Sequence, residues 1–253
     1  MYYLGVDGGG TKTNAVLTNA HGDDIRTIRE GSGNVSLLDR GSVAQLIRNL
    51  IKGLLKGEPV EKIHKAVFAF AGVGRPEEKS IVKEIIKGSG IKNFSLMTDA
   101  ELLYYSIFGE KRGMLLSSGT GSICLVRNGK NRLKQVGGRG YLLGDEGSGF
   151  DIGNKAIRAA VHDQEMGKPI SVLTRELLSF FGLNEPGELI TIMYSSKNPA
   201  RLTASCAKLV CEEAEKHEPN ALKIVDAAAR ALFELAMEAV PYLEEEALIE
   251  IAL

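Results

Sequence analysis

Two glycine turns, residues 8–10 and 119–121, each follow a short apolar run and could bind a polyphosphate. Glycine lets the main chain bend so that several backbone N–H groups converge on phosphate oxygens. Each turn alone could equally be a tight hairpin that binds nothing, but the pair favours phosphate binding. Neither G-x-x-x-x-G-K-[ST] nor G-x-G-x-x-G is complete, which argues against a Walker ATPase and a Rossmann dehydrogenase. The candidate phosphate ligands are Gly9, Gly10, Thr11, Lys12, Thr13, Gly119, Thr120, Gly121 and Ser122.

Three carboxylates follow apolar runs or glycine turns and could serve phosphoryl transfer. Asp7 closes the first strand beside the first turn, where Mg²⁺ with its retained waters would bridge it to phosphates. Asp99 could accept the proton of an attacking hydroxyl, or it could only cap the helix that follows, and the sequence favours neither. Asp145 lies with Glu146 in a glycine-dense run before a helix, which an ordinary loop does not explain.

Strands and helices alternate in the first half, and a strand, turn and strand pattern then returns. This restart predicts an internal repeat and two α/β domains, 1–109 and 110–253, of which the second is largely helical beyond residue 153. The strands expected are residues 2–6, 14–18, 24–30, 65–71, 94–97, 114–116, 123–126 and 248–253, with a hairpin at 128–129. The helices expected are residues 37–55, 76–87, 100–108, 172–180, 186–194, 202–217 and 221–243.

Composition excludes several classes of function. With 31 Lys and Arg against 32 Asp and Glu, the net charge of −1 gives no broad field for nucleic acid or an acidic membrane. No apolar run approaches the ~20 residues that span a bilayer, and the N-terminus shows no basic leader, so we expect a cytoplasmic protein. Three cysteines at no C-x-x-C spacing and four scattered histidines argue against disulfides and a zinc site.

The glycine turns, residues 98–100 and residues 144–148 together resemble, in order and spacing, the N-acetylglucosamine kinase branch of the BadF/BadG ATPase family. The resemblance covers nearly the whole chain. It implies two ribonuclease-H-like domains of the actin and hexokinase type, with ATP and Mg²⁺ in a cleft between them and a sugar hydroxyl as acceptor. It also implies that Asp99 is the catalytic base, that Asp7 and Asp145 order Mg²⁺, and that the sugar contacts are Asn34, Asp99, Thr120, Arg139, Gly140 and Asp145.

Two departures from the family pattern matter. Arg139 stands where the vertebrate pattern has an aromatic residue, so the identity of the sugar stays open, and Arg139 could equally be an ordinary surface arginine. The final strand leads in the family to a glycine turn that holds adenosine, and we expect this chain to lack that segment.

Two other functions stay open. An ATPase activator of a radical dehydratase would need cysteine thiolates to hold an iron–sulfur cluster, but Cys124, Cys206 and Cys211 are expected to be buried structural residues. A sugar sensor without turnover is the second alternative. The expected partner is a small sugar, and the sequence leaves a homodimer open.

Overall fold

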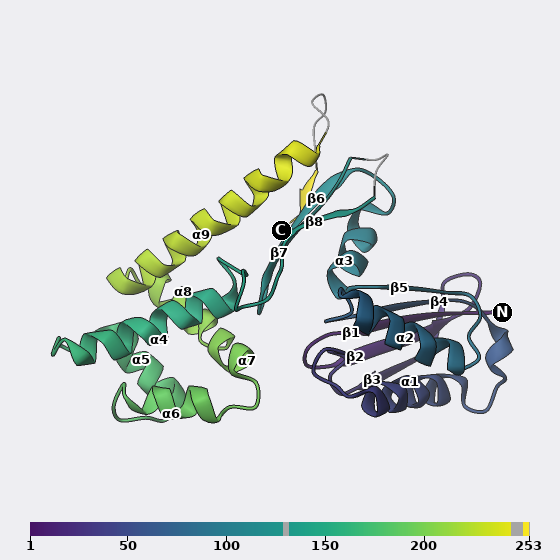
Figure 1. Cartoon of the computed structure of the whole chain (residues 1–253), viewed down its shortest axis with the longest axis horizontal. Coiled ribbons are helices and arrows are strands. Elements are labelled where there is room, and N and C mark those ends of the chain that lie inside the picture. Colours follow the sequence, from purple (N-terminus) through teal and green to yellow (C-terminus); the bar gives the residue numbers. More distant parts are fainter. Residues whose placement is uncertain (129–131, 244–249, 253) are drawn as a thin grey trace. The chain divides into compact units, whose positions relative to one another are not determined.

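The computed structural model describes residues 1–128, 132–243 and 250–252, and it divides the chain into two compact units, Met1–Gly109 and Glu110–Leu253. Figure 1 shows the elements of each unit. The first unit holds strands β1 (Tyr2–Gly8), β2 (Thr13–Thr18), β3 (Asp24–Glu30), β4 (Ile63–Phe70) and β5 (Phe94–Met97). Its helices are α1 (Arg40–Leu55), the 3₁₀ turn η1 (Val60–Lys62), α2 (Pro76–Gly88) and α3 (Asp99–Phe108).

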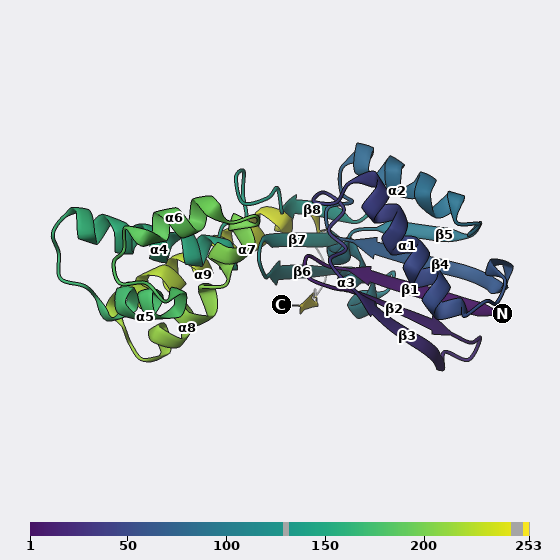
Figure 2. The same ribbon diagram turned by 90° about the horizontal axis from the view of Figure 1, so that it is seen from below.

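One mixed sheet organises the first unit, with strand order β3-β2-β1-β4-β5. β1 pairs antiparallel with β2 and parallel with β4, and β4 pairs parallel with β5. Successive strand residues point to opposite faces, so Leu4 and Val6 of β1 are buried in the core with Ile47, Leu50 and Leu54 of α1. Helices α1 and α2 cover this face of the sheet (Figure 2).

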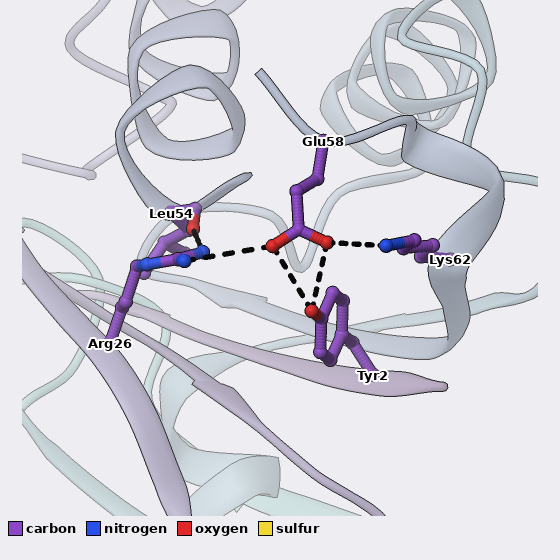
Figure 3. A network of polar contacts seen from close by, with 5 residues as sticks. All are labelled: Tyr2, Arg26, Leu54, Glu58 and Lys62. Atoms are coloured by element: carbon purple, nitrogen blue, oxygen red, sulfur yellow. Dashed lines mark hydrogen bonds and ion pairs between the residues drawn. The ribbon is translucent and has the colours of Figure 1, made fainter. Parts of the chain in front are cut away.

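The N-terminal strand is fixed to the end of α1 by a polar network around Glu58 (Figure 3). The carboxylate of Glu58 accepts from the hydroxyl of Tyr2 at 2.8 Å and from the ammonium of Lys62 at 2.8 Å. Arg26 lies 3.6 Å from the same carboxylate and donates to the Leu54 carbonyl at 2.7 Å. The bonds from Lys62 and Tyr2 lower the pKa of Glu58. This network ties β1 and β3 to the segment after α1, at the end of β1 away from the glycine turn.

The second unit repeats the strand arrangement of the first. Strands β6 (Gly113–Ser118), β7 (Ser122–Arg127), β8 (Lys134–Gly137) and β9 (Ile251–Ala252) have the order β8-β7-β6-β9. β6 pairs antiparallel with β7 and parallel with β9, as β1 does with β2 and β4. The repeat expected from the sequence is therefore confirmed. The sequence did not reveal β8. Gly129 of the expected hairpin and residues 248, 249 and 253 of the expected last strand lie outside the described residues.

The helices of the second unit form a second core beside its sheet. They are α4 (Gly149–Glu165), α5 (Val172–Phe181), α6 (Glu188–Ser195), α7 (Pro199–Ala204), α8 (Ala207–Glu215) and α9 (Pro219–Ala239), followed by the 3₁₀ turn η2 (Val240–Tyr242). α9 runs along the sheet, and α4 to α8 pack around the N-terminal half of α9 (Figure 1). Leu173, Leu177 and Val210 are buried among these helices. The single helix expected over residues 202–217 is wrong, because the chain breaks between α7 and α8 at Ser205 and Cys206. Within the residues described, no helix has both the length and the apolar character needed to cross a bilayer.

Candidate active site

The first glycine turn joins β1 to β2 and rests against the loop after β3. The amide of Gly9 donates to the Lys12 carbonyl at 2.9 Å, and the amide of Gly33 donates to the Gly9 carbonyl at 2.9 Å. A methyl group added at Gly33 would lie 2.5 Å from the Cα of Gly8, so the two main chains are in direct contact. A Cβ added at Gly10, in contrast, would have no atom within 4 Å. The outer side of the turn is therefore open to a ligand.

Asp7 and Asp99 lie at one edge of the first sheet. Strands β1, β4 and β5 are parallel, so their carboxyl ends meet at this edge, and Asp99 begins the helix that follows β5. Burial raises the pKa of Asp99; the Ala100 amide, which donates to its carboxylate at 3.0 Å, lowers the pKa by less, and the charge of Asp7 raises it again. A carboxylate with a raised pKa is a stronger proton acceptor, as general-base catalysis requires.

Thr98, rather than Asp99, caps α3. The Thr98 hydroxyl accepts from the Glu101 amide at 3.1 Å, and the Glu101 carboxylate accepts from the Thr98 amide at 2.7 Å. This reciprocal capping box satisfies two amides of the helix start without Asp99. Thr98 is therefore the N-cap residue, while Asp99 takes no part in the capping box and accepts only from the adjacent Ala100 amide among the hydrogen bonds described at this helix start.

Asn34 lies half-buried in the loop between β3 and α1. Its Oδ1 accepts from the Ser36 amide at 3.2 Å and the Ser36 hydroxyl at 2.7 Å, while none of the described residues accepts from its Nδ2. The backbone of Gly72 packs directly against the Asn34 side chain. Its φ of +80° favours glycine, and a Cβ added there would lie 2.6 Å from the Asn34 Oδ1. Sequence reasoning missed Gly72, and its signal was a glycine just after a buried strand. The Asn34 side chain is thus held through Oδ1, and its Nδ2 can still donate a hydrogen bond.

The second glycine turn joins β6 to β7 and is tied to the start of α4. The Gly119 amide donates to the Gly121 carbonyl at 2.8 Å. The carbonyls of Gly119 and Thr120 accept from the amides of Gly149 at 2.8 Å and Phe150 at 3.2 Å. The turn is therefore held by backbone hydrogen bonds, as the first turn is.

Asp145 connects this turn to the loop that carries Gly140. Its side chain is buried, and a Cβ added at Gly121 would lie 2.5 Å from its Oδ2. The Gly140 amide donates to its Oδ1 at 3.3 Å. Burial raises the pKa of Asp145, whereas hydrogen bonds from the Gly140 and Ser122 amides lower it and the charge of Glu146 raises it. Asp145 is thus a buried carboxylate held in contact with both the second glycine turn and the Gly140 loop.

Two hydroxyls expected to bind phosphate are used inside the protein instead. Thr13 and Ser122 begin the strands after the two turns, at equivalent places in the repeat, and both are buried. The Thr13 hydroxyl donates to the Gly31 carbonyl at 2.9 Å, and the Ser122 hydroxyl donates to the Glu146 carbonyl at 2.8 Å. Since a hydroxyl has one proton to donate, neither is available to a phosphate, and we leave both out of the proposed ligand set. The candidate residues that are exposed are Asp7, Gly10, Thr11, Lys12, Gly119, Thr120, Arg139 and Gly140.

Comparison with known proteins identifies the family to which the chain belongs. The sequence matches the profile of the BadF/BadG/BcrA/BcrD ATPase family over residues 4–248. The chain belongs to this family. It is similar to an N-acetylmuramic acid/N-acetylglucosamine kinase of Clostridium acetobutylicum, with 33% identity over 235 residues that cover 92% of this chain and 77% of that protein.

Two further relatives agree with this assignment. An N-acetyl-D-glucosamine kinase of Dictyostelium discoideum is 29% identical over 247 residues, covering 92% of this chain and 77% of that protein. A solved structure from Chromobacterium violaceum, described as a proposed N-acetylglucosamine kinase, superposes with a TM-score of 0.83. At 23% identity it covers 99% of this chain and 86% of the other, which shows a shared fold. The fold expected for this BadF/BadG-type chain is therefore confirmed.

The cysteines of this BadF/BadG-type chain are not set up as cluster ligands. Cys124 lies in β7 and Cys206 before α8, and both are buried. Burial raises the pKa of Cys124 to about 11 and that of Cys206 to about 12, so the thiolate that an iron–sulfur cluster needs is disfavoured at both. In the described ranges no three His, Cys, Asp or Glu side chains are grouped to hold a metal. The expected burial is confirmed for Cys124 and Cys206, but it is wrong for Cys211, which is half-buried on α8.

A direct test of the site electrostatics is the pKa of Asp99 in the ligand-free protein. We expect it to lie above the ordinary aspartate value and to fall in the Asp7→Asn variant, because Asp7 contributes to the increase. Carboxyl ¹³C NMR titration of aspartate-labelled protein measures this. Asp24→Asn is the control, since Asp24 is an exposed carboxylate of β3 that is not among the causes of the shift. An Asp99 pKa that does not respond to Asp7→Asn, or responds equally to Asp24→Asn, would contradict the coupling.

Proposed function

We propose that this protein is an ATP-dependent kinase that transfers a phosphoryl group to a hydroxyl of an amino sugar, such as N-acetylglucosamine, N-acetylmuramic acid or glucosamine. The observation that carries the proposal is Asp99, a half-buried carboxylate with a raised pKa that takes no part in the capping box of Thr98 and Glu101. The names of the curated relatives, all of them amino-sugar kinases, support the substrate class. The proposed phosphoryl donor is ATP, which the family assignment implies.

Asp99 would take the proton of the acceptor hydroxyl on its carboxylate oxygen. The sugar oxygen then forms a bond to the γ-phosphorus of ATP while the bond from that phosphorus to the bridging oxygen breaks, and ADP leaves with the electron pair. In the first unit Asn34 would bind the sugar as a donor. In the second unit Asp145 is the candidate acceptor for a sugar hydroxyl. Such positioning supplies much of the rate in phosphoryl transfer.

Phosphate binding in the first unit falls to the open side of its glycine turn and to Lys12. The Gly10 position has room for a ligand, and Lys12 is exposed. Mg²⁺ usually keeps several waters and takes one or two carboxylates besides phosphate oxygens, so the exposed carboxylate of Asp7 beside the turn fits its donor set. Magnesium, when bound, neutralises phosphate charge. Asp145 is a second candidate ligand, although its burial suits a sugar contact better.

Different observations argue against the ATPase activator and against the sugar sensor. The ATPase activator needs thiolate ligands, and the buried cysteines argue against them. The sugar sensor would not need a carboxylate with a raised pKa beside a phosphate-binding turn. Because the proposed donor is ATP, we place the activity in the cytoplasm.

Release of ADP from Mg-ATP, measured with each of several sugars, tests the function. We expect release only with an amino sugar, and the panel is N-acetylglucosamine, N-acetylmuramic acid, glucosamine and glucose, with a sample lacking sugar as control. Equal release in the absence of sugar would favour the activator. Sugar binding by calorimetry without any release would favour the sensor.

A further inference from the structure

A large cavity in the second unit is not used by the proposed chemistry. Its volume is about 880 Å³, and it lies between α4 on one side and α6 and α7 on the other. Tyr141 and Phe150 line it, with ring centroids 4.8 Å apart. Cavities of this size hold small-molecule ligands in many proteins.

This cavity begins where the proposed sugar loop ends. Tyr141 directly follows Gly140, whose amide donates to Asp145. Phe150 donates its amide to the Thr120 carbonyl at 3.2 Å. Two wall residues are thus joined, by one peptide bond and by one hydrogen bond, to residues expected to bind the sugar. A group carried by the sugar could extend into the cavity.

The two walls of the cavity differ in chemistry. Leu189, Ile190 and Met193 give α6 an apolar wall, and Ile157 and Val161 add apolar surface from α4. The remaining cavity residues of α4 are polar and recur at helical spacing, namely Asn154, Arg158, His162 and Glu165. Apolar surface on both sides together with a row of polar groups along α4 suits a ligand that is partly aliphatic and partly charged.

Of the charged residues of α4 that line the cavity, Arg158 and Glu165, Arg158 lies closer along the helix to Phe150 and the sugar loop. Among the described residues it has no hydrogen bond or ion pair. Arg158 follows Phe150 by eight residues, which is about 12 Å along the helix axis at 1.5 Å per residue. Long side chains on a helix lean towards its N-terminus, and Phe150 lies at the N-terminal end of α4. Glu165 lies seven residues further on, at the far end of α4. Of these two charged cavity residues, the one towards the sugar loop is therefore positive.

We propose that this cavity binds a carboxylate-bearing substituent of the sugar substrate, with the guanidinium of Arg158 holding the carboxylate. The proposal rests on the proposed kinase function and names its substrate class as an acidic ether of an N-acetylated amino sugar. Arginine suits this role because its planar donors match the two oxygens of a carboxylate. The aliphatic part of the substituent packs between Tyr141 and the α6 wall, and Asn154 supplies a further polar contact.

Three sugars and two variants test the proposal. The sugars are N-acetylmuramic acid, whose lactyl ether ends in a carboxylate, the same sugar with that carboxylate converted to a carboxamide, and N-acetylglucosamine. Arg158→Met keeps much of the aliphatic stem and removes the charge. Arg175→Met is the matched control, because Arg175 is an exposed arginine of α5 outside the cavity.

We expect Arg158→Met to lower kcat/KM for the carboxylate sugar about tenfold, at the low end of the value of a charged hydrogen bond because Arg158 is exposed. The loss should lie in KM, since the substituent does not react. Activity with the carboxamide and with N-acetylglucosamine should be unchanged, Arg158→Lys should restore part of the loss, and Arg175→Met should have no effect.

The outcomes separate this proposal from the kinase function itself. Equal losses for all three sugars, or no loss for any, would overturn the carboxylate site while leaving the kinase intact. So would wild-type protein that uses N-acetylglucosamine but shows no binding of the carboxylate sugar in calorimetry. Absence of turnover and of binding with every sugar would instead contradict the proposed function.

Discussion

Asp99→Asn should lower kcat by about 10² to 10⁴-fold, the usual contribution of a general base, and should leave sugar and nucleotide binding in place. Asparagine has nearly the same shape but cannot take the proton of the acceptor hydroxyl. Folding should be unaffected, because the capping box of Thr98 and Glu101 holds the start of α3 without Asp99. Steady-state kinetics with saturating sugar and ATP measures the loss, and calorimetry measures binding.

The control for this variant is Asp24→Asn, which removes an exposed carboxylate of the same unit. Its turnover should equal that of the wild type. Near-normal turnover in Asp99→Asn would remove Asp99 from the role of base. A loss of turnover accompanied by an equal loss of sugar affinity would make Asp99 a sugar ligand alone.

Gly33→Ala should destabilise the first unit and weaken ATP binding together. The added methyl group would lie 2.5 Å from the Cα of Gly8 and 2.6 Å from the Thr13 hydroxyl. Because the first of these is main chain, one of the two segments must move, and overpacking of this kind costs about 1–3 kcal/mol of the free energy of unfolding. The same movement would displace the first glycine turn, since the Gly33 amide donates to the Gly9 carbonyl.

Gly31→Ala is the matched control, two residues away in the same loop. A Cβ at Gly31 meets no atom within 4 Å, so its free energy of unfolding should stay within about 0.5 kcal/mol of the wild type, as for most surface substitutions. Urea denaturation and ATP titration measure both variants. Equal behaviour of the two alanine variants would show that the contact between Gly8 and Gly33 does not support the turn.

The sequence predicted the β-strands of the first unit well because β1, β2, β4 and β5 are short, mainly apolar runs bounded by turn residues, and the largely polar β3 follows a turn at residues 19–22. It missed β8, whose four residues Lys134–Gly137 include none that is fully buried, so burial left no pattern to read. It merged α7 and α8 because apolar residues keep helical spacing across the break, where Cys206 and Val210 are both fully buried. Periodicity reports the buried face of a segment and cannot distinguish one helix from two that share a core.

At the site, the sequence could identify residue types and could not assign their hydrogen bonds. The buried hydroxyls of Thr13 and Ser122 donate to carbonyls that lie 18 and 24 residues away in the chain. The choice between Thr98 and Asp99 as the cap depended on which side chain meets the Glu101 amide, a matter of about one residue in register. Loop closure sets these contacts, and a linear pattern of residue types does not encode it.

The backbone of Asp145 imposes a conflict between heat resistance and ligand recognition. Its φ of 66° lies in the left-handed region, which costs an ordinary residue about 1–2 kcal/mol, although aspartate adopts it more readily than most, and costs glycine almost nothing. Relief of this backbone strain alone would favour glycine at this position, at the loss of the hydrogen bond from the Gly140 amide. Selection for growth on a sugar that needs this carboxylate would preserve aspartate. Directed evolution of the protein for industrial temperatures should therefore hold residue 145 fixed and seek its gains elsewhere.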